Sequence, residues 1–438
     1  MNISEWSDDL DTTAAGEWAH KLMADLFPIC RSITGNGVRE SLAIIQKHVP
    51  VEIREVATDT PVFDWTVPRE WNVRDGYIKD ASGKRLIDFN EHNLHVLNYS
   101  QPVNKTVTRE ELEAHCFTIP DHPDRIPYRT SYYNDDWGFC LSQNQLDNLG
   151  EGPFDVCVDS SIEDGHLTYG ELVIPGKTKK EFLITSHICH PSLANDNLSS
   201  VSIAIYLAKE LAKLDLRYTY RFVFAPATIG AITWLAQNSE KLSNIKHALC
   251  LACTGDPGSI SYKKSRRGDA DVDTAMELVL SGRDQPYVVD EYTPWGYDER
   301  QYCSPGIDLP LGCFMRSKPG GYGEYHSSAD NLELVQPEFL ADSLSVLVEV
   351  IALLENSRAY RNTSPKCEPQ LGRRGLYEKI GGTTSEAKTD TMSLLWVMNY
   401  SDGEHGLPFI AKKSGIPMEK LEAAAKILME ADLLDALD

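Results

Sequence analysis

The chain has 438 residues, of which 42 % are hydrophobic and 24 % are charged, and Asp plus Glu outnumber Lys plus Arg by 65 to 42. This length predicts two or three domains, and the composition excludes disordered, collagenous and coiled-coil chains. A formal net charge of −23 opposes binding to phosphate backbones and anionic lipid, so we expect neither nucleic acid nor a membrane as a partner.

The N-terminal region predicts a cytoplasmic protein that begins with two helices. Its first residues lack the basic start and apolar run of a secretion signal, and no apolar stretch in the chain has membrane-spanning length. Apolar residues recur at helical spacing over residues 15–30 and stop at Pro28, and a second helix is expected to continue through Ile45. The ten cysteines are scattered through the chain, which predicts buried thiols rather than disulfides.

From residue 61 to residue 128 the sequence predicts a small β-rich domain. Short apolar runs alternate there with Pro, Gly and Asn, as in 71–73, 76–78, 86–89 and 94–97. A module of this kind, inserted into a larger domain, is expected to cover the mouth of an active site or to mediate assembly.

The larger domain is predicted to be an α/β domain formed by residues 1–60 and 129–362. Strand-like runs alternate with helical ones, and they fall at residues 154–158, 171–174, 182–185 and 220–224, with a helix over 199–214. This alternation predicts a mixed or parallel sheet with helices on both faces. In such sheets, binding and chemistry gather at the carboxyl ends of the strands.

After a link containing Pro365 and Gly372, residues 371–438 predict a winged-helix domain. Helices are expected at 392–398, 407–414 and 418–431, joined by short Gly-containing turns. The last helix is rich in Glu and has too few Lys and Arg residues for phosphate contacts, which predicts a role in packing or in a homo-oligomer.

Two histidines and two aspartates follow predicted strands of the α/β domain. His187 comes directly after the strand at 182–185, and Asp196 opens the next helix nine positions later. Asp256 follows the apolar run 248–252, and His326 stands in a Gly-containing loop. Neutral imidazole and carboxylate both suit Zn²⁺, although each residue alone would more often be structural.

Together, these motifs resemble the co-catalytic zinc aminopeptidases and glutaminyl cyclases. The resemblance is stronger to one branch, the bacterial aminopeptidase-like proteins associated with polysaccharide biosynthesis, which carry an inserted domain and a C-terminal winged helix. The strings that support it are Cys30-Arg-Ser-Ile-Thr-Gly35, Pro68-Arg-Glu-Trp-Asn-Val73, Trp137-Gly-Phe-Cys140, Asp298-Glu-Arg-Gln-Tyr-Cys-Ser-Pro-Gly306 and Glu324-Tyr-His-Ser-Ser-Ala-Asp330. They extend over nearly the whole chain.

The resemblance implies one or two zinc ions. It assigns His187 as the first ligand, Asp196 as the bridging carboxylate, Asp256 as a later ligand and His326 as the last. Asp298 takes the position of an acidic residue near the substrate pocket.

Two further residues lie beside these ligands in the sequence. The role of His190 has three alternatives: it binds the metal, it hydrogen-bonds to a ligand, or it is a core residue that caps a helix. Cys189 is expected to be a packed thiol.

The turn at residues 225–230 departs from the family pattern. It reads Ala-Pro-Ala-Thr-Ile-Gly, where the family has Pro-Glu-Thr-Ile-Gly and the wider zinc aminopeptidases have two glutamates. Ala227 therefore replaces the general base, and Thr228 stands where a second carboxylate would bind metal. Either the chain is a natural pseudo-enzyme, or a glutamate at position 227 has been replaced deliberately. The intact metal motifs favour deliberate replacement, because a decaying site usually loses its ligands too.

The expected reaction is zinc-dependent hydrolysis of an amide bond next to a free amino group, in a small peptide or an amino-acid conjugate. Arg129, Tyr132, Arg300 and Arg316 are candidates for binding such a substrate, because guanidinium groups can clamp a carboxylate. Equally, they could be solvated or paired with neighbouring acids. The alternative function is a zinc-bearing binding protein without catalysis.

Overall fold

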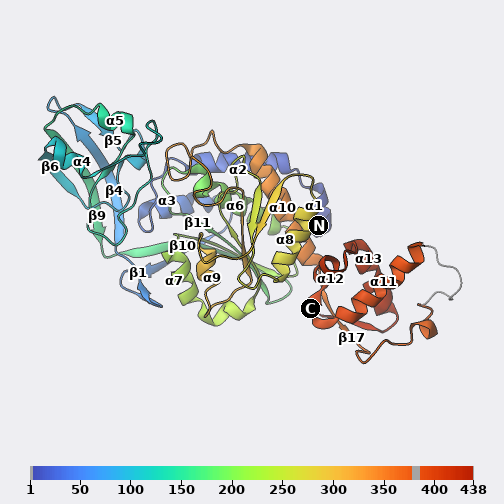
Figure 1. Cartoon of the computed structure of the whole chain (residues 1–438). Coiled ribbons are helices and arrows are strands. Elements are labelled where there is room, and N and C mark those ends of the chain that lie inside the picture. The colour runs from blue at the N-terminus through green and yellow to red at the C-terminus, as the bar shows by residue number, and fades with distance from the viewer. Residues whose placement is uncertain (1–2, 377–384, 438) are drawn as a thin grey trace.

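The structure is a computed structural model that describes residues 3–376 and 385–437. An α/β core lies in the middle of the molecule, with a β-rich domain at one end and a small helical domain at the other (Figure 1). Within the described residues, no helix is both long and apolar enough to cross a membrane.

The core contains an eight-stranded mixed sheet. In spatial order its strands are β1 (Glu52–Ala57), β10 (His166–Ile174), β12 (Thr219–Ala225), β11 (Glu181–His187), β13 (Ile245–Leu251), β16 (Leu311–Met315), β14 (Ile260–Lys263) and β15 (Tyr287–Asp290). The four central strands, β12, β11, β13 and β16, are parallel, so their carboxyl ends meet at one edge. The pairs β1–β10, β10–β12 and β16–β14 are antiparallel. The predicted mixed sheet is thus confirmed.

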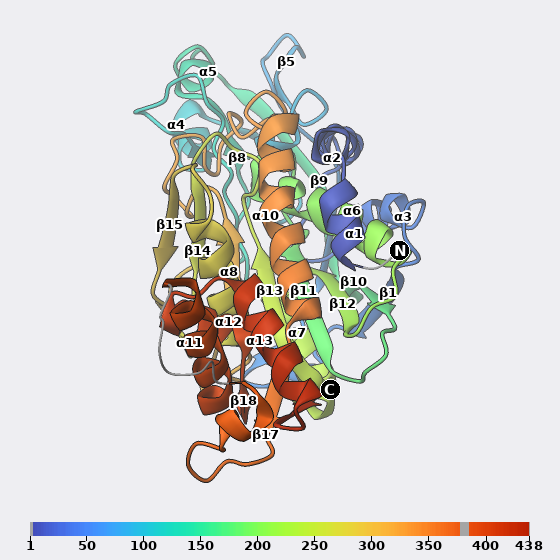
Figure 2. The same ribbon diagram turned by 90° about the vertical axis from the view of Figure 1, so that its right-hand side faces the viewer.

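Helices cover both faces of this sheet, as predicted (Figure 1). One apolar core unites the sheet with α1 (Ile3–Asp9), α2 (Thr12–Leu26), α3 (Asn36–Ile45), α6 (Ser200–Leu211), α8 (Asp271–Ser281) and α10 (Pro337–Asn356). The opposite face packs on α7 (Ile229–Gln237) and α9 (Glu299–Tyr302). Short helical turns at η2 (Ala194–Ser199) and η3 (Ser239–Asn244) complete the core. The long helix α10 lies lengthwise over its face and leads toward the C-terminal domain (Figure 2).

The inserted domain is larger than the sequence predicts. Its four-stranded antiparallel sheet has the order β5 (Arg85–Asp88), β4 (Glu70–Lys79), β9 (Phe154–Glu163) and β6 (Val103–Val107). It also contains η1 (Asn93–His95), α4 (Arg109–Glu113), β7 (Cys116–Phe117), β8 (Phe139–Cys140) and α5 (Gln143–Asp147). The hairpin of β2 (Pro61–Val62) and β3 (Trp65–Thr66) lies instead against α7 of the core.

The strand at 154–158, which the sequence analysis assigned to the α/β sheet, instead forms part of β9. It pairs with β4 and β6 because its alternate residues Phe154, Val156 and Val158 are buried against the apolar side of the small sheet.

The C-terminal domain has the helices of a winged helix and a sheet that starts earlier than predicted. Its elements are β17 (Ala359–Asn362), η4 (Leu371–Arg374), α11 (Ser385–Tyr400), β18 (Asp402–Gly406), α12 (Leu407–Ser414), α13 (Met418–Glu430) and β19 (Leu434–Leu437). Strand β17 lies between β18 and β19, so residues 359–362 belong to this domain and not to the core. Residues 377–384 and 438 of the predicted domain lie outside the described residues.

The winged helix packs against the core through α12 and α8. Lys412 of α12 forms an ion pair with Glu277 of α8, and Leu278 packs against the apolar core of the small domain. Helix α12 is therefore partly covered by the core.

Candidate metal centre

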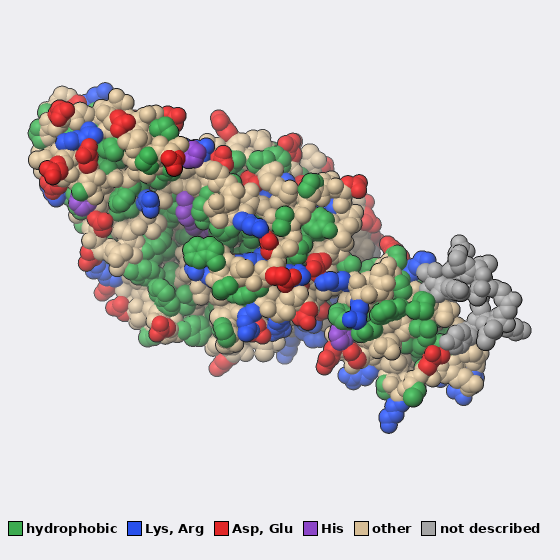
Figure 3. Space-filling model, in the orientation of Figure 1, with side chains coloured by type: hydrophobic (Ala, Val, Ile, Leu, Met, Phe, Trp, Pro, Cys, Tyr) green, Lys and Arg blue, Asp and Glu red, His purple; other side chains and the backbone are tan. Residues whose placement is uncertain are grey.

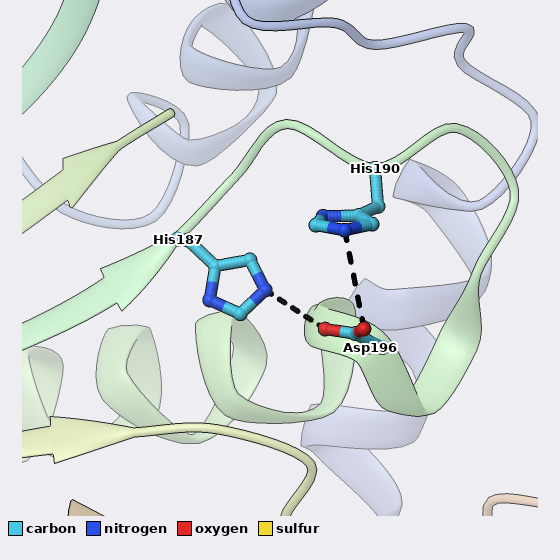
Figure 4. Close-up of side chains that lie close together, drawn as sticks. All are labelled: His187, His190 and Asp196. Atoms are coloured by element: carbon cyan, nitrogen blue, oxygen red, sulfur yellow. Dashed lines mark hydrogen bonds and ion pairs between the residues drawn. The ribbon is translucent and has the colours of Figure 1, made fainter. Parts of the chain in front are cut away.

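The candidate site lies at the carboxyl ends of the parallel strands. His187 is the last residue of β11, His190 follows in the next loop, and Asp196 lies in η2, just before α6. Both imidazoles point toward the carboxylate of Asp196 (Figure 4). Strand-end placement of this kind is where sites in α/β sheets are expected, so topology alone brings these groups together.

Asp196 is the centre of the cluster. Its Oδ1 lies 2.8 Å from Nε2 of His187, and its Oδ2 lies 3.1 Å from Nε2 of His326 and 3.9 Å from Nε2 of His190. The potential ligand atoms of His187, His190 and Asp196 all lie within 4.8 Å of one another. The structure therefore gathers three of the four predicted ligands and adds His190, whose role the sequence left open.

Burial and the neighbouring histidines shift the pKa of Asp196 in opposite directions. Burial alone would raise the pKa of Asp196, but His190, His187 and His326 together hold that pKa well below its usual value. Burial lowers the pKa of His190 to about 3, so its imidazole is neutral. A buried carboxylate among imidazoles is a donor set that suits a divalent cation.

Tyrosine rings line the cluster and orient its imidazoles. Tyr297 stacks on His187 with ring centroids 5.2 Å apart, and Tyr325 stacks on His326 at 3.9 Å. Tyr128 lies 5.0 Å from the ring of His190. The hydroxyl of Tyr128 is hydrogen-bonded at 2.9 Å to that of Tyr132, which brings this predicted substrate-binding residue to the wall of the site.

Asp330 supports Asp196 from behind, a function that sequence reasoning missed. Its carboxylate accepts hydrogen bonds from the backbone N–H groups of Asn195, at 2.5 Å, and Asp196, at 3.0 Å. It also accepts one from the hydroxyl of Tyr322, at 3.2 Å. Its position four residues after His326, within a string that carries the family resemblance, is the signal that could have found it.

We expect Asp330→Asn to lower the free energy of unfolding by about 1–3 kcal/mol and to weaken zinc affinity roughly 10- to 100-fold. The amide that replaces one carboxylate oxygen is a donor, so it cannot accept from both backbone N–H groups. Urea unfolding and zinc titration against a chelator would measure the two effects. Asp121→Asn removes the same charge from an exposed position and is expected to change neither quantity.

The position of the missing base borders the cluster. The backbone N–H of Ala227 donates to Sγ of Cys189 at 3.3 Å, and that sulfur lies 3.4 Å from Nδ1 of His190. Burial raises the pKa of the Cys189 thiol, so it stays protonated and packs as a neutral group. Thr228 follows as the N-cap residue of α7 and makes no side-chain capping bond. A side chain longer than alanine at position 227 would thus begin beside the candidate ligands.

Asp298 is a buried carboxyl close enough to His187 to interact with its charge. Burial raises the pKa of Asp298 to about 6, an effect that the charge of His187 partly offsets. Its Oδ1 atom is buried and has no hydrogen-bond partner among the described residues. An acid of this kind, close to a cluster of imidazoles, is poised to exchange a proton near neutral pH.

The structure does not bring Asp256 into the cluster. Its two carboxylate oxygens are occupied by Nδ2 of Asn195 at 2.8 Å, by the hydroxyl of Ser317 at 2.6 Å and by the backbone N–H of Gly258 at 2.7 Å. Those bonds tie the loop after β13 to its neighbours. The residue of this loop that faces the site is Cys253, whose Sγ lies 2.8 Å from the hydroxyl of Tyr297.

The three predicted substrate-binding arginines differ in their surroundings. Arg316 is buried and pairs with Asp342 at 2.7 Å while its Nε donates to Gly258, so its guanidinium is engaged in the fold. Arg129 is exposed. Arg300 lies over the ring of Trp295 at 5.8 Å. Of the three, Arg300 follows Asp298 by two residues, and its buried Nε has no hydrogen-bond partner among the described residues, so it is the strongest candidate for contact with substrate.

Two protein families match this chain. Residues 20–357 match a domain of unknown function, DUF4910, and residues 358–436 match a winged helix-turn-helix family. The second match begins at the residue before β17, in agreement with the domain boundary in the structure.

Two relatives from Clostridium acetobutylicum are similar over nearly the full length, and a third protein shares the fold of the core. A protein of Clostridium acetobutylicum, named as a polysaccharide biosynthesis protein with an aminopeptidase-like domain, is 51 % identical over 97 % of both chains. The crystal structure of a C. acetobutylicum protein named as a peptidase superposes with a TM-score of 0.87, covers 99 % of both chains and is 48 % identical. A zinc aminopeptidase of Bacillus subtilis shares the fold, with a TM-score of 0.55 and 12 % identity over 77 % of this chain and 94 % of the other.

Proposed function

Because this chain belongs to the DUF4910 family and has the aminopeptidase-like fold, we propose that it is a zinc-dependent amidohydrolase of the aminopeptidase type whose hydrolytic step is impaired by Ala227. The observation that carries the proposal is the buried carboxylate of Asp196, with imidazole nitrogens of His187 and His326 within 3.1 Å and that of His190 at 3.9 Å.

His187, His190 and Asp196 would hold the ion. A catalytic zinc site commonly has three protein ligands and one open position, and these three residues offer nitrogen and oxygen donors close together. Asp256 is engaged elsewhere and Thr228 offers no carboxylate, so the chain favours one ion over two. His326, whose side chain is 35 % exposed, contacts the other oxygen of Asp196 on the accessible side. There it could be a fourth ligand or could contact the substrate.

When bound, zinc would act as a Lewis acid toward the amide carbonyl of the substrate. Residues of the chain would position the ligands and transfer protons. Tyr297 fixes the ring plane of His187, and Tyr325 fixes that of His326. Asp330 holds the backbone of Asp196 in place. Asp298 could take up or return a proton, whereas Ala227 cannot, which leaves the site without a base at the position where the family has glutamate.

The substrate class that fits is a small peptide or an amino-acid conjugate with a free amino group. The buried acid Asp298, close to His187, would attract an ammonium group, and Arg300 could pair with a substrate carboxylate. The second candidate function is a zinc-bearing protein that binds such a conjugate without cleaving it, and the methyl side chain of Ala227 is the observation in its favour.

Metal analysis tests the zinc site. After treatment with a chelator and dialysis against zinc, the protein is expected to retain about one equivalent of zinc, because three potential donors, two of them fully buried, lie within 4.8 Å of one another. Plasma emission spectrometry of the dialysed protein measures the ratio. Retention of no zinc would refute both functions, and retention of two ions would refute the single-ion site while leaving the amidohydrolase in place.

A further inference from the structure

A second polar pocket lies at the junction of the core and the winged helix. It has a volume of about 300 Å³ and is lined by the amino-terminal ends of β11 and β13, by the end of α10 and by β18. The strands run from this pocket toward the metal centre. With seven residues in β13 at ~3.3 Å each, the two sites lie about 20 Å apart, at opposite edges of the sheet.

Cationic side chains gather around this pocket in a chain of strongly negative charge. Its lining contains Lys180, Arg217, Lys246 and Arg358, together with two acids, Asp271 and Glu404. Asp271 neutralises one cation through an ion pair of 2.8 Å with Lys246. Figure 3 shows Lys and Arg side chains on both sides of the junction.

Two of the guanidinium groups retain donors for a ligand. Arg358 is exposed and makes no hydrogen bond or ion pair with any residue in the described part of the chain. Arg217 uses one nitrogen to contact the carbonyl of Ser357 and lies 4.9 Å from the ring of Tyr218. Its remaining N–H groups have no partner among the described side chains.

His247 supplies an independent observation. The residue is 1 % exposed, lines the pocket, and neither of its ring nitrogens has a hydrogen-bond partner among the described residues. Its ring is held edge-on by Phe182 at 5.6 Å and Tyr218 at 4.9 Å. Burial lowers the pKa of His247 to about 3, so the imidazole is neutral and offers one N–H donor. A buried polar ring without a partner is costly, and a ligand would satisfy it.

We propose that this pocket binds a small phosphate-bearing anion, either free phosphate or a phosphate ester, and that Arg358, Arg217 and His247 donate to it. A carboxylate is satisfied by one guanidinium, whereas phosphate has several oxygens and suits convergent donors from different elements. Because Arg358 directly precedes β17 and His247 belongs to β13, the ligand would connect the two domains and stabilise their contact. This site is independent of the proposed amidohydrolase function.

Isothermal titration calorimetry on the full chain tests the site, with inorganic phosphate and adenosine monophosphate as separate probes at constant ionic strength. We expect saturable binding of at least one probe. Arg358→Ala should weaken it roughly tenfold, because one charge-assisted contact is lost. His247→Phe should weaken it to a similar degree while keeping the aromatic packing. Lys179→Ala removes a nearby exposed charge outside the pocket and should leave affinity unchanged.

Tighter binding of the nucleotide would identify a phosphate ester as the natural ligand, and tighter binding of inorganic phosphate would identify the free anion. Two results would overturn the proposal. One is the absence of saturable binding for both probes, and the other is equal affinity in the wild type and Arg358→Ala. Arg358 is exposed, so its variant is expected to fold and the comparison does not depend on His247→Phe.

Discussion

Ala227→Glu is expected to raise the rate of amide hydrolysis by roughly 10²- to 10⁴-fold, because a positioned general base contributes about that much. The backbone of residue 227 lies next to Cys189, whose sulfur contacts His190, so a carboxylate at this position would lie beside the candidate ligands. Ala227 is only half-buried, which leaves room for a longer side chain. The measurement is the hydrolysis of a panel of aminoacyl-p-nitroanilides by the zinc-loaded protein.

Ala227→Gln is the matched control. Glutamine has nearly the same size and can accept a hydrogen bond, but it cannot take a proton, so it should stay at the wild-type rate. If the glutamate variant holds zinc and is no faster than the glutamine variant, residue 227 is not the base position and the non-catalytic binding function is favoured. A gain confined to the glutamate variant would identify Ala227 as the cause of the impairment.

Local pattern was sufficient to predict that His187 and Asp196 would lie together in the candidate metal centre. His187 ends a strand and Asp196 starts the following helical segment nine residues later, so both are positioned by one strand–loop–helix unit that can be recognised in the sequence. The helix at 407–414 was predicted for a similar reason, since Pro408 and Gly415 mark its ends. His326 was a candidate from its Gly-containing loop, but its assignment as the last ligand came from the family resemblance, because 130 residues separate it from Asp196.

Contacts between distant segments could not be predicted in this way. Strand β9 pairs with β4, about ninety residues earlier, and β17 pairs with β19 at the C-terminus, so both boundaries depend on pairing that leaves no local signature. The direction of the Asp256 side chain could not be predicted for the same reason. It stands after a strand, as a ligand would, but its loop turns so that the carboxylate meets Ser317 and Asn195 instead of the histidines.

His190 shows how geometry resolves an ambiguity that the sequence left open. Three residues after His187, it could have faced the core or capped a helix. The loop after β11 returns it to the carboxylate of Asp196, and its ring lies 5.0 Å from that of His187. A second imidazole from the same loop thus lies close to His187 and Asp196, so this cluster offers three potential donors although the turn at 225–230 has no carboxylate.

Asp196→Asn is expected to abolish stoichiometric zinc binding. The wild-type carboxylate has one oxygen beside His187 and the other beside His326 and His190, so the substitution replaces a charged ligand with a neutral amide at the centre of the cluster. Loss of even an outer partner of a ligand typically costs 10- to 100-fold in metal affinity, and loss of the central ligand should cost more. Chelator-competition titration measures the affinity directly.

Thermal unfolding gives an independent readout of the same loss. Zinc at 100 times its Kd stabilises a native protein by about 2.7 kcal/mol, so added zinc should raise the Tm of the wild type and leave that of Asp196→Asn unchanged. Asp298→Asn is the matched control, because it removes a buried carboxyl from the same region without removing a proposed ligand. Wild-type zinc affinity in Asp196→Asn would contradict the site. An equal loss of zinc affinity in Asp196→Asn and Asp298→Asn would show that zinc binding depends on the negative charge of the region and not on coordination by Asp196.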